Sequence, residues 1–157
     1  MRIGITGHSN LSQDSVPLVL DALRALLADA RALVGVTCLA RGADQVFAHA
    51  VLDVGGEIEV VLPAADYRAR KVKPDNAAEF DTLLGKAAAV TTMPFEQSDR
   101  DAYMAASEHV LACVDRLVAV WDGQPSGGHG DTADVVAAAQ QRGIPVTVIW
   151  PDGARRA

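Results

Sequence analysis

Short apolar segments alternate with helix-like segments along the whole chain, and this alternation constrains the fold more than any other feature. The short segments are rich in β-branched residues and are each long enough for one buried strand; they cover residues 2–6, 35–40, 58–62, 88–92, 116–121 and 145–150. Between them, apolar residues at helical spacing predict amphipathic helices over residues 16–30, 43–54, 76–87, 101–113 and 132–142. A repeated strand-helix unit favours parallel strands joined by right-handed crossovers. The sequence therefore predicts an α/β fold with a doubly wound, mostly parallel sheet and helices on both faces.

The length of 157 residues suits one domain with one hydrophobic core. No linker or internal repeat divides the chain, so we expect residues 1–153 to form a single domain and residues 154–157 to form a frayed tail. Residues 64–75 are the most irregular and the most basic segment. We expect them to form a surface loop, which could serve as a lid.

Charge and hydropathy exclude several classes of partner. No stretch approaches 18 apolar residues and the first residues turn polar within one strand length, which predicts a cytoplasmic protein with no membrane partner. The chain has 14 Lys and Arg against 20 Asp and Glu, a formal net charge of −6. This balance argues against general nucleic-acid binding and against DNA processing. The two Cys and four His lack metal-ligand spacing, so no metal site is predicted.

The loops that follow the predicted strands form the candidate site, because ligands of open α/β sheets bind outside the carboxyl ends of the strands. Gly7 and His8 follow the first strand, and Arg41, Gly42 and Asp44 follow the second. The alternative for each loop is an ordinary turn into a helix. We assign all five residues to ligand binding.

The loop after the fifth predicted strand carries the strongest signal, with three glycines within four residues immediately before a helix. Glycines allow positive φ and a close approach of backbone N–H groups to a ligand, and a helix N-terminus adds partial positive charge. The loop therefore suits a phosphate or carboxylate, although it is neither a P-loop nor a dinucleotide fingerprint. The alternative is a flexible turn with Asp131 as the helix cap. The predicted ligand-binding residues of this loop are Asp122, Gly123, Gly127, Gly128, His129, Gly130, Asp131 and Thr132.

Several of these motifs also occur together in a known family. The chain contains Gly4-Ile5-Thr6-Gly7-His8, then Arg41-Gly42-Ala43-Asp44, and later an Ala-Val-Trp-Asp-Gly segment that leads into the glycine-rich loop. In this combination, which spans nearly the whole chain, it resembles the SLOG superfamily. That group includes Lonely Guy phosphoribohydrolases, DNA-processing protein A and molybdenum-cofactor carrier proteins. The resemblance implies a Rossmann-like sheet with a nucleotide-type ligand at its carboxyl edge.

Lonely Guy enzymes cleave the N-glycosidic bond of a nucleoside monophosphate with a catalytic Arg and a catalytic Glu. By resemblance these correspond to Arg100 and Asp134, which are the candidate catalytic residues. The sequence departs from the family pattern where Asp101 replaces a Lys, where Asp131 is an extra residue, and where Val135 replaces a second Glu. Asp134 must also approach its target more closely than a Glu, and misplacement by about an ångström can cost about a hundredfold in rate. The match is therefore to the superfamily more than to the hydrolase.

The predicted site is rich in carboxylates, which repel a bare phosphate: Asp44, Asp122, Asp131 and Asp134. Compensation could come from Arg41, Arg100, protonated His129, Mg²⁺, or a ligand that turns its sugar hydroxyls and base toward the carboxylates, which we favour. The sequence thus predicts a sensor or carrier that binds a nucleotide or nucleotide-derived ligand. The alternative is a nucleoside 5′-monophosphate phosphoribohydrolase that releases base and ribose 5-phosphate. The base, the number of phosphates, a need for Mg²⁺ and the oligomeric state, a homodimer included, stay open.

Overall fold

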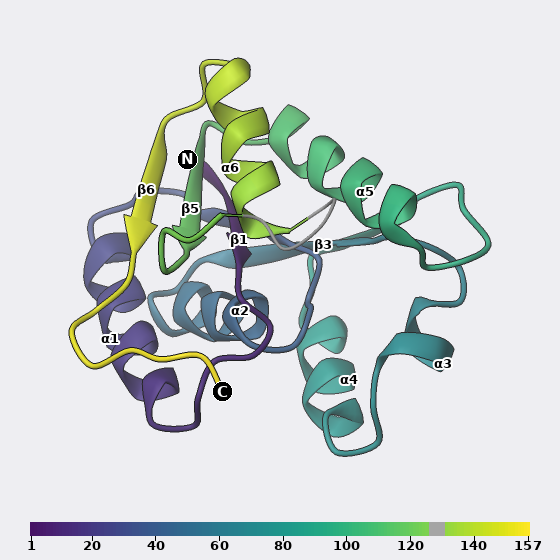
Figure 1. Cartoon of the computed structure of the whole chain (residues 1–157), viewed down its shortest axis with the longest axis horizontal. Coiled ribbons are helices and arrows are strands. Elements are labelled where there is room, and N and C mark those ends of the chain that lie inside the picture. The colour runs from purple at the N-terminus through teal and green to yellow at the C-terminus, as the bar shows by residue number, and fades with distance from the viewer. Residues whose placement is uncertain (126–130) are drawn as a thin grey trace.

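A parallel sheet runs through the centre of the protein (Figure 1). The computed structural model describes residues 1–125 and 131–157, and within these ranges six strands pair in the order β4-β3-β2-β1-β5-β6. All neighbouring strands are parallel, as predicted. The elements are β1 (Arg2–Gly7), α1 (Ser15–Leu27), β2 (Val34–Thr37), α2 (Ala43–Asp53), β3 (Glu57–Leu62), α3 (Tyr67–Lys71), α4 (Ala77–Gly85), β4 (Ala89–Thr92), α5 (Arg100–Ala112), β5 (Arg116–Val120), α6 (Thr132–Gln141) and β6 (Val146–Ile149).

The direction in which the chain adds strands reverses beside β1. The first four strands extend the sheet to one side, after which the chain crosses back so that β5 pairs with β1 and β6 pairs with β5. Ile3 of β1 is in register with Gly35 of β2 on one side and with Arg116 of β5 on the other. The carboxyl ends of β1 and β5 therefore flank the topological switch point, where ligands of open α/β sheets bind.

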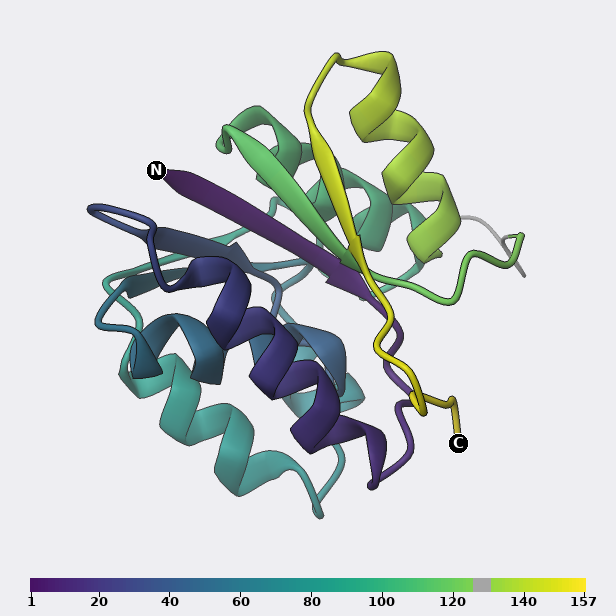
Figure 2. The ribbon, with the colours of Figure 1, turned by 90° about the vertical axis from the view of Figure 1, so that its left-hand side faces the viewer.

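Helices cover both faces of the sheet, as the alternating pattern predicts (Figures 1 and 2). Helices α1, α2 and α4 pack on one face, where Leu23, Phe47 and Phe80 are fully buried. Helices α5 and α6 pack on the other face, where Ala106 contributes to a smaller apolar cluster. The fold is a doubly wound, Rossmann-like α/β sheet, and every predicted strand and helix is present with ends shifted by a few residues. No helix among the described residues is long and apolar enough to cross a bilayer.

The basic segment 64–75 differs from the expected surface loop, because it contains the short helix α3. The first residue of α3, Tyr67, is only 7% exposed and packs against Phe80 of α4 and Tyr103 of α5. Burial of this one aromatic ring anchors a segment whose other side chains are largely polar. A single anchor within five helical residues gives no periodicity that could be recognised in the sequence.

Residues 154–157 also differ from the expected frayed tail. Arg156 pairs with Leu11 in an antiparallel bridge, and the Ala157 N–H donates to the Asn10 carbonyl at 2.6 Å. Ser15, the first residue of α1, is fully buried and accepts a hydrogen bond from the Arg155 N–H at 2.7 Å. The last residues are therefore fixed against the connection between β1 and α1.

Candidate functional site

A cavity of about 650 Å³ opens at the carboxyl edge of the sheet. Its walls come from the loops after β1 and β2, from α3 and the residues that follow it, from one side of α5, from the first turn of α6 and from the segment after β6. These are the elements that meet at the switch point. The cavity is thus where the fold class places a ligand.

The cavity brings together some of the residues predicted for the site and leaves others apart. The predicted ligand-binding residues that line it are Gly7, His8, Arg41, Asp44, Asp131 and Thr132. Gly42, Asp122 and Gly123 belong to the same loops but do not line it, and neither do the candidate catalytic residues Arg100 and Asp134. The predictions for Gly127, Gly128, His129 and Gly130 lie outside the described residues. All of these functional roles stay predictions.

His8 connects the two loops that flank the switch point. Its Nε2 accepts a hydrogen bond from the Asp122 N–H at 3.1 Å, and the Asp122 Oδ1 lies 3.2 Å from the same nitrogen. Burial and the nearby Arg156 guanidinium lower the pKa of His8, although Asp122 opposes this shift. The same ring nitrogen thus meets both a donor and an acceptor of Asp122, and through these contacts His8 holds the end of β1 against the loop after β5.

Asp44 places a buried carboxyl group in the wall of the cavity. It lies in the first turn of α2, and the Ala40 N–H donates to its Oδ2 at 3.3 Å. Burial raises the pKa of Asp44 to about 7, against the effect of backbone hydrogen bonds from Ala40 and Cys38. Near neutral pH this group can therefore either hold a proton or accept one, depending on what occupies the cavity.

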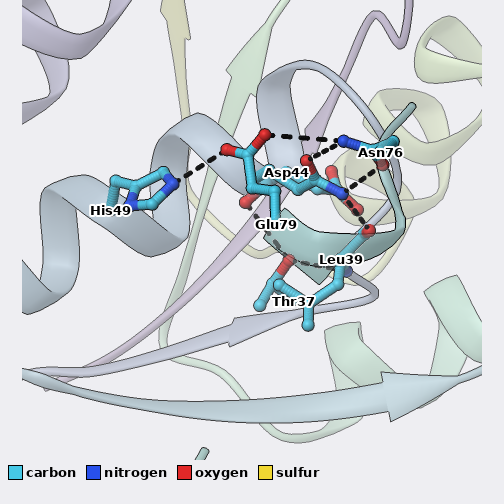
Figure 3. A network of polar contacts seen from close by, with 7 residues as sticks. Thr37, Leu39, Asp44, His49, Asn76 and Glu79 are labelled. Atoms are coloured by element: carbon cyan, nitrogen blue, oxygen red, sulfur yellow. Dashed lines mark hydrogen bonds and ion pairs between the residues drawn. The ribbon is translucent and has the colours of Figure 1, made fainter. Parts of the chain in front are cut away.

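A buried amide pair fixes the loop after β2 and the start of α4 (Figure 3). Gln45 Nε2 donates to the Leu39 carbonyl at 3.1 Å and to Asn76 Oδ1 at 2.9 Å, while Asn76 Nδ2 donates back to Gln45 Oε1 at 2.9 Å. Leu39 has a positive φ of 56°, which is uncommon for a residue with a side chain. The Leu39 N–H donates to Thr37 Oγ1 at 3.0 Å, so hydrogen bonds on both sides hold this strained residue in the cavity wall.

Two of the predicted site glycines have a packing role that the sequence did not indicate. A Cβ on Gly7 would lie 2.5 Å from the Ala43 Cβ and 2.9 Å from the Val120 carbonyl oxygen. A Cβ on Gly42 would lie 2.6 Å from the His8 carbonyl oxygen, and Gly42 has a φ of 87°. These glycines let the ends of β1 and β5 meet the N-terminus of α2, which brings His8 and Asp44 to one cavity.

Four cationic side chains line the cavity, and only Arg41 among them was a predicted site residue. Arg41 forms two hydrogen bonds with Asp75, at 2.8 and 3.2 Å. The others are Lys71, Lys73 and Arg156, whereas the acidic lining residues among those described are Asp44 and Asp131. The basic composition of residues 64–75 could have indicated the two lysines. The parallel order of the sheet could have indicated Arg156, because the segment after β6 must emerge at this same edge.

The acidic residues do not gather in a form that suits a metal ion. Within residues 1–125 and 131–157, no three His, Cys, Asp or Glu side chains come close enough to one another to hold one. Asp122 is engaged with His8, and Asp44 with the backbone of its own loop. The repulsion expected between these carboxylates and a phosphate is instead opposed by the lysines and arginines of the cavity wall.

Sheet order, helices on both faces and a crevice at the switch point define the Rossmann-like class of α/β proteins. No protein-family model and no curated protein sequence matches the chain. Solved structures match its fold: DNA processing protein A (DprA) from Streptococcus pneumoniae covers 97% of the chain with a TM-score of 0.73 at 19% identity. DprA from Helicobacter pylori covers 99% with a TM-score of 0.69, and the Moco carrier protein from Chlamydomonas reinhardtii covers 94% with a TM-score of 0.55, both at 17% identity.

The chain spans 51% of the S. pneumoniae DprA chain, 68% of the H. pylori DprA chain and 74% of the Moco carrier protein chain. Both kinds of protein are in the group that the motifs resemble. The matches confirm the Rossmann-like fold that this resemblance implies, over nearly the whole chain.

Proposed function

We propose that the protein binds a nucleotide or a nucleotide-derived anion in the cavity at the carboxyl edge of its sheet. The observation that carries this proposal is the charge of the cavity wall. Although the chain has a formal net charge of −6, its cavity is lined by Arg41, Lys71, Lys73 and Arg156. Four cations at one concave site in an acidic protein favour an anionic ligand.

Size and position support the same function. A volume of about 650 Å³ lies within the usual range of roughly 300–1,000 Å³ for small-molecule sites. The first turn of α6, with Asp131 and Thr132, reaches the cavity, and a helix N-terminus there favours negative charge. One relative of the same fold is described as a carrier of the molybdenum cofactor, which is consistent with a sensor or carrier role for this chain.

Two other functions have less support. The H. pylori DprA is described as binding single-stranded DNA, but Arg41, Lys71, Lys73 and Arg156 of this chain line one cavity, and its net charge of −6 disfavours a long nucleic acid. The phosphoribohydrolase alternative depends on Arg100 and Asp134. Arg100 is exposed at the start of α5, and neither residue lines the cavity. Ligand binding needs neither of these two residues.

Thermal unfolding with a panel of nucleosides, nucleoside 5′-monophosphates and sugar phosphates tests the proposal. At about one hundred times its dissociation constant, a ligand adds about 2.7 kcal/mol to the free energy of unfolding, which raises the Tm by about 5–10 °C for a chain of this size. The double variant Lys71→Ala/Lys73→Ala should bind the best monophosphate roughly 2- to 30-fold more weakly by calorimetry. Lys86→Ala is the matched control, because Lys86 is exposed and does not line the cavity.

Two results contradict the proposal. One is a Tm that no member of the panel shifts at millimolar concentration. The other is a monophosphate affinity that the double lysine variant leaves unchanged, because the ligand then lies away from the cations that motivate the site.

A further inference from the structure

The segment after β6 brings an arginine to the switch point. Because β6 runs parallel to β5, the chain leaves it at the carboxyl edge, and Figure 2 shows this last segment running beside the connection between β1 and α1. Trp150, directly after β6, meets the His8 ring edge-on at a centroid distance of 5.6 Å. Six residues further along, Arg156 lines the cavity.

Part-buried hydrogen bonds fix the backbone next to this arginine. The Ser12 N–H donates to the Arg155 carbonyl at 2.9 Å, and Ser15 Oγ donates to the same carbonyl at 3.1 Å. The Arg155 N–H in turn donates to Ser15 Oγ at 2.7 Å, and Ser15 is fully buried. A side chain that starts from a fixed backbone loses less conformational entropy when it binds a ligand.

The guanidinium of Arg156 contacts groups on both sides of the switch point. Its Nε donates to Asn10 Oδ1 in the loop after β1 at 3.0 Å, and its Nη1 lies 3.7 Å from Asp122 Oδ2 in the loop after β5. The Arg156 side chain is 45% exposed. A guanidinium carries five N–H donors, so a hydrogen bond to one neutral amide and one long ion pair leave donors for an anion.

Arg41, the other arginine of the cavity wall, is placed differently. Both of its terminal nitrogens bond the two carboxylate oxygens of Asp75, which is the paired geometry in which a guanidinium also grips a phosphate. A phosphate at Arg41 would therefore have to displace Asp75. A phosphate at Arg156 displaces no such paired carboxylate, and Arg156 lies at the switch point itself.

We propose that Arg156 binds the phosphate group of the ligand, so that the segment after β6 completes the anion subsite of the cavity. This inference rests on the proposed function and adds to it the residue that recognises the phosphate. The imidazole of His8 and the amide of Asn10 lie beside this guanidinium. The ligand class is accordingly a phosphomonoester, whose phosphate the guanidinium can bind through charge-assisted hydrogen bonds.

Calorimetry with the four common ribonucleoside 5′-monophosphates and their four nucleosides tests the inference. The wild type should bind its preferred monophosphate more tightly than the matching nucleoside. Arg156→Ala should reduce that preference about ten- to hundredfold while changing the nucleoside affinity by less than about twofold, since a charge-assisted bond to phosphate is lost. Arg155→Ala is the matched control, because the side chain of Arg155 does not line the cavity.

Arg156→Gln provides a second variant, because the glutamine amide can still donate to Asn10 while the charge is removed. It should lose the preference for the monophosphate over the nucleoside, as Arg156→Ala does. Urea unfolding of each variant shows whether the fold is intact. If the wild type binds monophosphates and both variants keep the full preference, the inference is wrong and the proposed function stands. Equal weakening of nucleoside and monophosphate also contradicts it. If the wild type binds neither kind of ligand, the proposed function itself fails.

Discussion

The carboxyl group of Asp44 titrates in a range where most aspartates are fully ionised. Burial raises its pKa to about 7 from an ordinary value of 3.8, although backbone hydrogen bonds from Ala40 and Cys38 oppose the shift. Between these two pH values the folded chain holds a proton that the unfolded chain has released. The contribution of Asp44 to the free energy of unfolding therefore falls as the pH rises, by up to about 1.4 kcal/mol per pH unit.

We expect Asp44→Asn to remove this slope, because its amide oxygen can still accept the Ala40 N–H but the side chain no longer titrates. The difference in free energy of unfolding, variant minus wild type, should become more positive from about pH 4 to pH 7 and level off above pH 7. Groups that titrate alike in both proteins, such as His8, cancel in this difference. Urea unfolding at a series of pH values measures it, and a difference that stays constant across the series would show that the pKa of Asp44 is not raised.

Asp44 and His8 could be predicted as site residues because ligands of open α/β sheets bind at the carboxyl ends of the strands. Each residue lies within a few positions of a strand that is easily recognised in the sequence. This rule could not predict which residues of the site pair with one another. Asp122 is 114 positions away from His8, and Gln45 and Asn76 meet across 31 positions. A hydrogen bond between such residues has no local pattern, since it exists only once the sheet and helices are in place.

At the scale of elements, the meeting of the β1 end with the N-terminus of α2 is the contact that shapes the cavity. The Ala43 N–H donates to the His8 carbonyl at 3.1 Å, and Gly42 lets the two backbones come this close. Gly42 has φ 87° and ψ −127°, a conformation open to glycine but not to residues with a Cβ. The glycine predicted as a ligand contact thus has a purely structural reason to be glycine.

Gly42→Ala should lower the free energy of unfolding by about 2–4 kcal/mol, through both backbone strain and the clash with the His8 and Ser9 carbonyls. Gly55→Ala is the matched control, since Gly55 shares the φ of 87° but has nothing within 4 Å of an added Cβ. It should cost only about 1 kcal/mol. Urea unfolding of both variants gives the comparison, and equal losses would mean that the approach of the two loops is not tight.

The spacing of apolar residues predicted the strands and the longer helices, because each of these elements buries apolar side chains along its whole length. It failed for α3, where five residues depend on one buried ring of Tyr67. It failed again for residues 154–157, whose pairing partner Leu11 lies at the other end of the chain. Both missed segments line the cavity, which explains why Lys71 and Arg156 were absent from the predicted site.

For the whole molecule, the net charge is negative, whereas the charged side chains that line the cavity are mostly positive. The chain has six more acidic than basic residues, yet its cavity wall holds four cations and two acidic side chains among the described residues. A long nucleic acid samples the field of the entire surface, whereas a small anion inside the cavity interacts mainly with the groups around it. The net charge therefore argues against a long nucleic acid as partner but not against a small anion.

This opposition predicts that the protein binds a mononucleotide but not an oligonucleotide. A labelled oligothymidylate of about 30 nucleotides should show no saturable binding by fluorescence anisotropy up to about 100 μM protein at physiological salt, where sequence-independent DNA-binding proteins typically bind at about 1–100 μM. Nucleoside monophosphates measured in the same buffer provide the positive comparison. Micromolar binding of the oligonucleotide, with an affinity that falls steeply as salt is added, would contradict the prediction. It would mean that the chain neutralises several phosphates along a strand, which four cations around one cavity cannot do.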